Sequence, residues 1–275
     1  MASQLLIYES AVPVSAARHG NLSVEVGADY SFSKGVNSVP LMAVEFPHAA
    51  AEYAIVFSGT AEAFIPAVIL GMRGSENLYL GEQGGWQGKY IPAFVRRYPF
   101  VFSSSQDGKT FTLCIDEAFP GFNREGRGQP LFGEDKKPSA YVSNVLKFLE
   151  QYQLEFRRTQ AFCNKLKDLG LLEPMRAQAN LPSGERLALT GFMAVSRDKL
   201  KALPGDKLAE LAKTDELELL YLHLQSMRNF SAMIERLGGK AQPAQPPEPA
   251  IAPPAPEPEV KGDGRKGEPA GKGKK

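Results

Sequence analysis

The sequence has few of the residues on which enzymes and metal sites most often depend. Its 275 residues include three histidines, two cysteines and one tryptophan. No two His or Cys residues stand at the spacing of a metal site, and the sequence has neither a Gly-x-Ser-x-Gly elbow nor a phosphate-binding glycine loop. We therefore predict no metal and no cofactor, and the composition favours a protein that is not an enzyme.

Charge of one sign and long apolar runs are also missing. A formal net charge of +1 gives no electrostatic reason to expect a nucleic-acid partner. The longest apolar run, FIPAVILGM, is far shorter than the roughly 20 residues of a membrane span. The N-terminus has no basic region ahead of its first apolar residues, so it does not read as a secretory signal. These absences predict a soluble, cytoplasmic protein.

The two cysteines do not form the pairing pattern of a small secreted scaffold. Cys114 and Cys163 each lie within an apolar pattern. We therefore predict two buried thiols rather than a disulfide or a nucleophile.

Alternating apolar and polar residues predict that the first half of the chain is rich in strands. Residues 52–58 are apolar enough for a central strand, and Asp107-Gly108 predicts a hairpin turn between two neighbouring strands. Residues 64–73 fit either a short helical turn or a buried strand. The clearest turn is the glycine-rich segment 82–89. The predicted strands are 22–27, 41–46, 52–58, 76–80, 101–105 and 109–116.

Helical periodicity dominates the second half. Apolar residues recur at spacings of three or four from Val142 to Leu169, and Gly170 supplies a stop, so a long helix is predicted over 139–170. Residues 184–196 predict one or two strands with a bend at Gly191. Together these patterns predict an α+β fold with a strand-rich N-terminal half and a helix-dominated C-terminal half. Shorter helices are predicted over 197–204, 205–213 and 214–238.

Composition divides the chain near its C-terminal end. Residues 1–239 have the apolar content of a single globular domain, with a long surface loop predicted over 117–138. Residues 240–275 are a Pro/Ala/Glu tract followed by a Gly/Lys end, which cannot bury enough apolar surface to fold. We predict a disordered tail here, and its excess of seven Lys and Arg over five Asp and Glu permits only weak contacts with nucleic acid.

The segment 76–102 holds the only tryptophan, a run of aromatic residues and two adjacent arginines. Aromatic residues and arginine are enriched at recognition surfaces, but aromatics also fill cores and an arginine can pair with a carboxylate such as Glu76. Both interpretations stay open. Neighbouring residues of an extended segment point to opposite faces, so only one of the two arginines can enter a common pocket. The candidate binding residues are Glu76, Asn77, Trp86, Tyr90, Arg96, Arg97 and Tyr98.

Several stretches resemble, in this order, the bacterial SapC family: PAVILGMRGSENLYL, GGWQGKYIPAFVRRYPFVF, PLF at 130–132 and GFMAVSRDKLKALPGDKLAELAKTDELELLYLHLQSM. The resemblance covers about residues 5–237 and leaves out the tail. The family takes its name from a surface-layer protein locus, so the resemblance implies a link to surface-protein export or assembly. It implies no catalytic residue and no cofactor.

Two hypotheses for the function follow. The first is a non-enzymatic binding or accessory protein whose partner, a protein or peptide, meets a surface centred on 86–98. The alternative is an enzyme acting on a peptide or small carboxylated molecule, anchored by Arg96 or Arg97, with Glu76, Glu45 or His48 as acid or base. A flat, exposed aromatic patch would favour the first, and a deep pocket joining an arginine to a carboxylate or histidine would favour the second.

Overall fold

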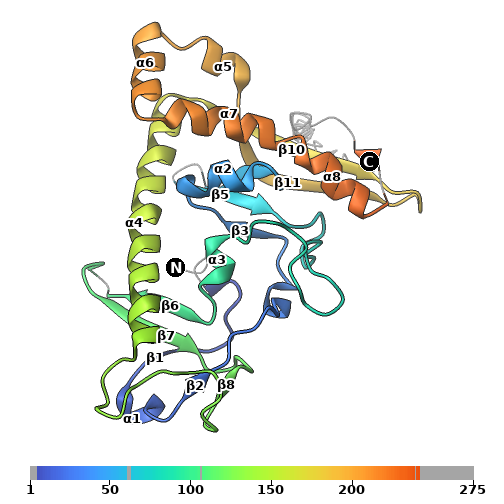
Figure 1. The fold of residues 1–275 in the computed structure, drawn as a ribbon. Coiled ribbons are helices and arrows are strands. Elements are labelled where there is room, and N and C mark those ends of the chain that lie inside the picture. Colours follow the sequence, from blue (N-terminus) through green and yellow to red (C-terminus); the bar gives the residue numbers. More distant parts are fainter. Residues whose placement is uncertain (1–4, 61–62, 106, 239, 242–275) are drawn as a thin grey trace, which may run out of the picture.

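The computed structural model describes residues 5–60, 63–105, 107–238 and 240–241. Strands are concentrated in the N-terminal half and helices in the C-terminal half, which confirms the predicted α+β class. Within these ranges the strands form a six-stranded sheet and two sheets of three strands. The long helix α4 (Ala140–Asp168) runs along one side of the molecule, from the small sheets at one end to α6 (Gly205–Lys213) at the other (Figure 1).

The main sheet combines both halves of the chain. β4 (Ile55–Gly59) pairs with β5 (Phe64–Ile69) on one side and with β11 (Arg186–Val195) on the other. Phe57 packs in a core cluster with Phe162 of α4, whereas Val56 belongs to a second cluster. Because both faces of β4 are covered, its unbroken apolar run forms a central strand, as predicted. The strand order is β12 (Lys240–Ala241), β10 (Leu172–Asn180), β11, β4, β5 and β3 (Ser38–Pro40), all antiparallel.

The two small sheets hold the N-terminal segment against the middle of the chain. The predicted hairpin across Asp107-Gly108 is confirmed, and the N-terminal strand adds to its outer edge. The predicted surface loop 117–138 contains two short strands that were not expected. The first small sheet has the order β1 (Ala11–Pro13), β7 (Phe111–Asp116) and β6 (Phe100–Ser104), and the second has the order β8 (Phe122–Asn123), β2 (Ser23–Val24) and β9 (Gln129–Pro130).

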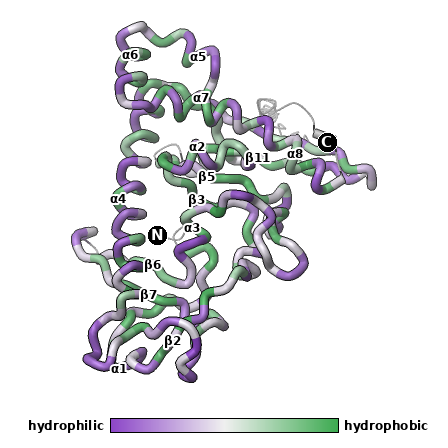
Figure 2. Tube along the Cα trace, viewed as in Figure 1, coloured by the Kyte–Doolittle hydropathy of each residue, from purple (hydrophilic) through white to green (hydrophobic). Residues whose placement is uncertain are grey.

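The predicted long helix is confirmed almost to the residue. The Ser139 hydroxyl accepts a hydrogen bond from the Val142 backbone N–H at the start of α4, and Gly170 adopts φ 63° just beyond its end. Along α4, hydrophilic and hydrophobic residues alternate (Figure 2). This is the pattern of a helix with one face in the core, and Leu149, Tyr152 and Leu166 are among its buried residues.

The C-terminal helices match the predictions except for the last. α5 (Arg197–Lys201) and α6 form as expected, but residues 214–238 make two helices, α7 (Glu216–Ser226) and α8 (Asn229–Arg236), which lie across β10 and β11 (Figure 1). The break occurs where polar side chains bind distant backbone. The Asn229 side-chain amide donates to the carbonyls of Ala50 and Tyr53, and Ser226 Oγ accepts from the Ile55 N–H.

The strand predicted at 41–46 is wrong. The Glu45 carboxylate accepts the backbone N–H of Met42 at 2.8 Å, which closes a capping box around the 3-10 helix η3 (Ala43–Glu45). α2 (Phe46–Ala49) follows directly, with Pro47 in its first turn. Successive tight turns bury Met42 and Phe46 and leave Val44 exposed, so burial here does not follow the alternation of a strand.

Other strand predictions fail in part. Only β2 forms within 22–27, and 76–80 contributes a single bridge between Leu80 and Trp86. Residues 64–69 are the strand β5, which settles the two alternatives for that segment. The strand β10 was not predicted, because Pro174 and the two charged residues Glu173 and Arg176 mask its alternation. The bend predicted at Gly191 is present at φ 81°, within one continuous strand and beside the register shift between Met175 and Ala177.

Three further predictions concern the cysteines, the tail and the membrane. Both cysteines are free and buried, as predicted, and burial raises the pKa of Cys163 to about 12. The predicted disordered tail lies outside the described residues except for Lys240 and Ala241, which pair with β10. None of the helices in the described ranges combines the length and apolarity needed to cross a bilayer.

The remaining helices are α1 (Ala16–His19), the 3-10 helix η2 (Ser31–Ser33) and α3 (Ala93–Arg96).

Candidate functional site

A pocket of about 310 Å³ opens where three segments meet. One wall comes from η3 and α2, the second from Tyr90 and α3, and the third from the middle of α4. A volume of this size is at the lower end of the range for small-molecule sites. The lining residues are Met42, Val44, Glu45, His48, Tyr90, Ala93, Arg96, Phe148, Gln151, Tyr152 and Glu155.

The α4 wall follows from helical spacing. Phe148, Gln151, Tyr152 and Glu155 are three or four residues apart, so they lie on one face of the helix, one turn above another. Tyr152 is buried, whereas Gln151 is exposed. This face therefore provides an apolar base with polar groups beside it.

Glu45 ties the other two walls together. It is 4% exposed, and both of its carboxylate oxygens accept hydrogen bonds. Oε2 accepts from the Met42 N–H at 2.8 Å, while Oε1 accepts from the Ala93 N–H and the Tyr90 hydroxyl, each at 2.7 Å. Burial raises the pKa of Glu45, and these donors together with the charge of Arg96 oppose that rise. Glu45 thus shapes the pocket through its hydrogen bonds and places a titratable group in its wall.

Arg96 supplies the cation. It is exposed, and its guanidinium lies 5.5 Å from the ring centre of Phe148 and 5.8 Å from that of Tyr90. Its Nε donates to the Ile91 carbonyl at 3.0 Å, which fixes the direction of the side chain. Among the described residues Arg96 has no carboxylate within ion-pair distance. Its charge acts on the Glu45 carboxylate in the same wall, at a distance longer than that of an ion pair.

Tyr90 and His48 complete that end of the pocket. The two rings stack, with centroids 5.4 Å apart and planes 20° from parallel. Burial and the adjacent Glu45 carboxylate raise the pKa of Tyr90, so its hydroxyl stays a neutral donor at physiological pH. His48 is exposed, which places an imidazole at the rim.

Glu155 is a second carboxylate in the wall, on α4. It is 9% exposed, and its Oε1 accepts from Gln151 Nε2 and from Arg158 Nη1, each at 2.8 Å. Glu155 was not among the residues predicted from the sequence. A usable signal was present, because Glu155 lies on the buried stripe of a predicted helix, where an apolar residue is expected.

The structure brings together Tyr90 and Arg96 from the predicted binding set and places them beside Glu45 and His48. The other predicted residues lie elsewhere. Arg97 is 3% exposed, with its guanidinium over the rings of Phe94 at 4.3 Å and Tyr152 at 5.0 Å. Arg96 and Arg97 diverge because successive helical residues point about 100° apart.

Trp86 and Tyr98 contribute mainly to packing. The Trp86 indole N–H donates to the Tyr53 hydroxyl at 2.8 Å, and its ring stacks on Tyr79. Trp86 is half-buried, so the glycine-rich turn presents no fully exposed indole. Tyr98 is buried and stacks on Phe32 with ring centroids 4.0 Å apart.

Glu76 and Asn77 stabilise a neighbouring loop. Glu76 pairs with Arg73 at 2.7 Å, and Arg73 also reaches Glu185 at 2.8 Å. The Asn77 side-chain amide donates to the backbone carbonyl and the hydroxyl of Ser33. Neither residue lines the pocket at Arg96.

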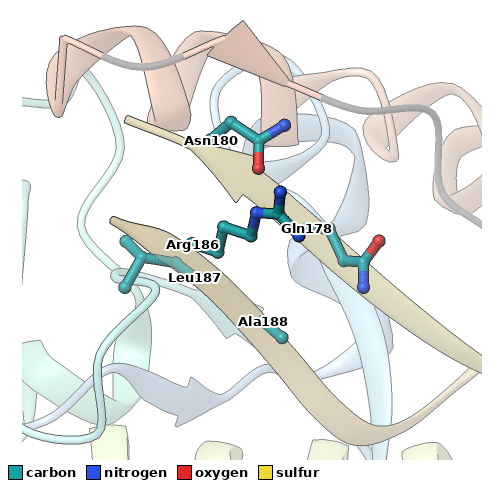
Figure 3. Close-up of a pocket in the computed structure, with 5 residues that line it drawn as sticks. All are labelled: Gln178, Asn180, Arg186, Leu187 and Ala188. Atoms are coloured by element: carbon teal, nitrogen blue, oxygen red, sulfur yellow. The ribbon is translucent and has the colours of Figure 1, made fainter. Parts of the chain in front are cut away.

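A second hollow, of about 220 Å³, lies on the β10–β11 hairpin. Figure 3 shows the Arg186 side chain of β11 extending between Gln178 and Asn180 of β10. Arg186 and Asn180 are exposed cross-strand neighbours, so solvent reaches both groups. This hollow has a single charged group and no buried polar one, and it offers less chemistry than the pocket at Arg96.

Among the described residues, no group of three or more His, Cys, Asp or Glu side chains could hold a metal ion.

Comparison with protein-family models gives a match: the model of the SapC family matches residues 14–233. No curated protein and no solved structure matches the chain.

Proposed function

The chain belongs to the SapC family, and on that premise we propose that it binds a small carboxylated molecule, or the carboxyl end of a peptide, in the pocket at Arg96. The observation that carries this proposal is the placement of Arg96. Its guanidinium is oriented by the Ile91 carbonyl and by two aromatic rings, yet it faces the pocket without a carboxylate partner from the described residues.

The chemistry of the guanidinium supports an anionic ligand. It carries five N–H donors in a planar arrangement, of which Nε is engaged by Ile91, so the terminal N–H groups can hold a carboxylate through two parallel hydrogen bonds. Phe148, Tyr152 and Met42 would bury the apolar body of the ligand. An organic acid with an apolar portion therefore suits the pocket better than an inorganic anion.

Binding without catalysis is the function favoured by the state of Glu45. A general base needs a lone pair directed at the substrate, and three of the roughly four acceptor sites of the Glu45 carboxylate are already occupied by Met42, Ala93 and Tyr90. The second candidate is an enzyme acting on the same ligands. It is supported by the raised pKa of Glu45 and by His48 stacked on Tyr90 at the rim.

The proposed cellular role rests on the family name and on the sequence. A cytoplasmic binding protein linked to surface-protein export or assembly could recognise a peptide or a carboxylated molecule used in that process. The partner would then place its carboxylate in the Arg96 pocket. Trp86 would contribute to this surface only by stabilising the glycine-rich turn at 82–89.

The test compares N-acetylphenylalanine with its uncharged amide by isothermal titration calorimetry at low and physiological salt. We expect the acid to bind about tenfold more tightly than the amide, because a charge-assisted hydrogen bond contributes about 1.5–3 kcal/mol before screening. Arg96→Gln is expected to remove that preference. Arg127→Gln is the matched control, because Arg127 is exposed and pairs with Glu125 outside the pocket.

Equal binding of the acid and the amide, no binding of either at millimolar concentration, or an acid preference that survives Arg96→Gln would each contradict the proposal. The enzyme alternative is examined with acetylated dipeptides that end in phenylalanine, whose hydrolysis releases a new amine. Release of the amine by the parent protein, together with its loss in His48→Gln, would favour the enzyme.

A further inference from the structure

The pocket is charged differently at its two ends. Arg96 lies over the ring of Phe148, and Glu155 is seven residues further along α4. At a rise of about 1.5 Å per residue, these two levels of the helix are about 10 Å apart. Tyr152, between them, is buried and apolar along most of its side chain. The pocket thus offers the Arg96 cation at one end, beside a Glu45 carboxylate that already accepts three hydrogen bonds, the Glu155 carboxylate at the other end, and an aromatic surface in between.

Glu155 has capacity left for a ligand. Its Oε1 accepts from Gln151 and Arg158, whereas its Oε2 accepts no hydrogen bond from the described residues. The side chain of Arg158 is 65% exposed, so water screens the ion pair and the pair leaves part of the carboxylate charge uncompensated. A buried carboxylate with an unused oxygen in a pocket wall is suited to an ammonium group.

We propose that the ligand of this pocket is a short zwitterion, with its carboxylate on Arg96 and its ammonium on Glu155. This inference rests on the proposed function and extends it to the substrate class. The two charges must be separated by more than a single amino acid allows. Two extended residues span up to about 7 Å, and a hydrogen bond at each end adds about 3 Å, so a dipeptide bridges the two levels.

The test measures four ligands by calorimetry: alanylphenylalanine, its N-acetyl derivative, its C-terminal amide, and free phenylalanine. We expect the dipeptide to bind most tightly, with losses of about tenfold on acetylation and about tenfold on amidation, the size of one charge-assisted hydrogen bond each. Phenylalanine should bind more weakly than the dipeptide, because its two charges cannot reach both ends.

Variants assign each preference to one residue. Glu155→Gln should abolish the preference for the free amine and keep the preference for the free carboxylate, while Arg96→Gln should do the reverse. Arg158→Gln should act in the opposite direction to Glu155→Gln. By removing the competing cation it should strengthen the preference for the free amine, and because Arg158 is exposed this variant is expected to fold normally.

The outcomes separate the two proposals. If acetylation has no effect in the parent protein or in Arg158→Gln, while amidation still weakens binding, the zwitterion inference is overturned and the carboxylate site stands. If amidation also has no effect, the proposed function fails as well. Thermal unfolding of each variant shows whether a loss of binding reflects the site or the fold.

Discussion

The Tyr90 hydroxyl donates a 2.7 Å hydrogen bond to Glu45 Oε1, joining the segment before α3 to the 3-10 helix η3. The same oxygen accepts the Ala93 N–H, so one buried carboxylate fixes the two walls of the pocket relative to each other. Both the stability of the fold and its dependence on pH should therefore reflect this link.

Removing the hydroxyl tests how much the link stabilises the fold. Tyr90→Phe leaves a buried carboxylate with one donor fewer, so the free energy of unfolding should fall by about 1–3 kcal/mol. Urea denaturation followed by circular dichroism measures it. Tyr221→Phe is the control, because Tyr221 is about half exposed (47%), and it should change stability by less than about 0.5 kcal/mol. Equal effects of the two substitutions would show that the Tyr90–Glu45 bond contributes little.

Glu45 should make stability depend on pH. Because its pKa is higher in the folded chain than its ordinary value of 4.5, the folded state binds more protons just above that pH. Stability from this group is therefore greatest at low pH and falls as pH rises through the raised pKa. Glu45→Gln lacks the titration, so the parent should lose stability relative to this variant as pH rises from 4.5. If the parent instead gained stability relative to Glu45→Gln as pH rises, the hydrogen-bond donors would outweigh burial in setting the pKa of Glu45.

His223 should act in the opposite sense. It is fully buried, accepts a hydrogen bond at Nε2 from the Val195 N–H, and burial lowers its pKa to about 4 from 6.5. The unfolded state binds more protons between these values, so stability is complete above pH 6.5 and falls by up to about 3 kcal/mol as pH drops to 4. Denaturation of the parent and of His223→Gln over this range isolates the contribution. A parallel pH dependence in the two proteins is inconsistent with a buried neutral imidazole.

Trp86 should affect the fold more than the pocket. Trp86→Phe keeps most of the stacking on Tyr79 but loses the hydrogen bond to Tyr53, so the free energy of unfolding should fall by about 1 kcal/mol. Because Trp86 does not line the pocket, the preference of the protein for N-acetylphenylalanine over its amide should persist. Loss of that preference in a folded variant would indicate that the glycine-rich turn is part of the recognition surface.

The two cysteines should be inert in the folded protein. Both are buried, and burial raises both thiol pKa values, so little thiolate is present or accessible at neutral pH. Ellman's reagent should therefore modify neither until urea unfolds the chain, after which both should react. Rapid labelling of one thiol under native conditions would show that its burial is transient.

Much of the fold was accessible from local patterns. Helix α4, the hairpin at Asp107-Gly108 and the central strand β4 were predicted because each depends on periodicity or turn residues within a few positions. Local patterns failed where a distant contact or a side-chain cap competed with them. Residues 41–46 form helical turns instead of the predicted strand because the Glu45 carboxylate caps the Met42 N–H. One predicted helix is two helices because Asn229 binds the backbone carbonyls of Ala50 and Tyr53 at the start of α8.

The sequence by itself determined the α+β class, the burial of both cysteines and the likeness to the SapC family, because composition, periodicity and motif order carry these properties. It also selected Tyr90 and Arg96 as candidates. Only the tertiary structure decided that Arg96 faces the pocket while Arg97 enters the core, and that Glu45 and Glu155 line the same cavity. These relationships arise where α4 packs against η3 and α3, and packing between segments distant in the chain leaves no local pattern in the sequence.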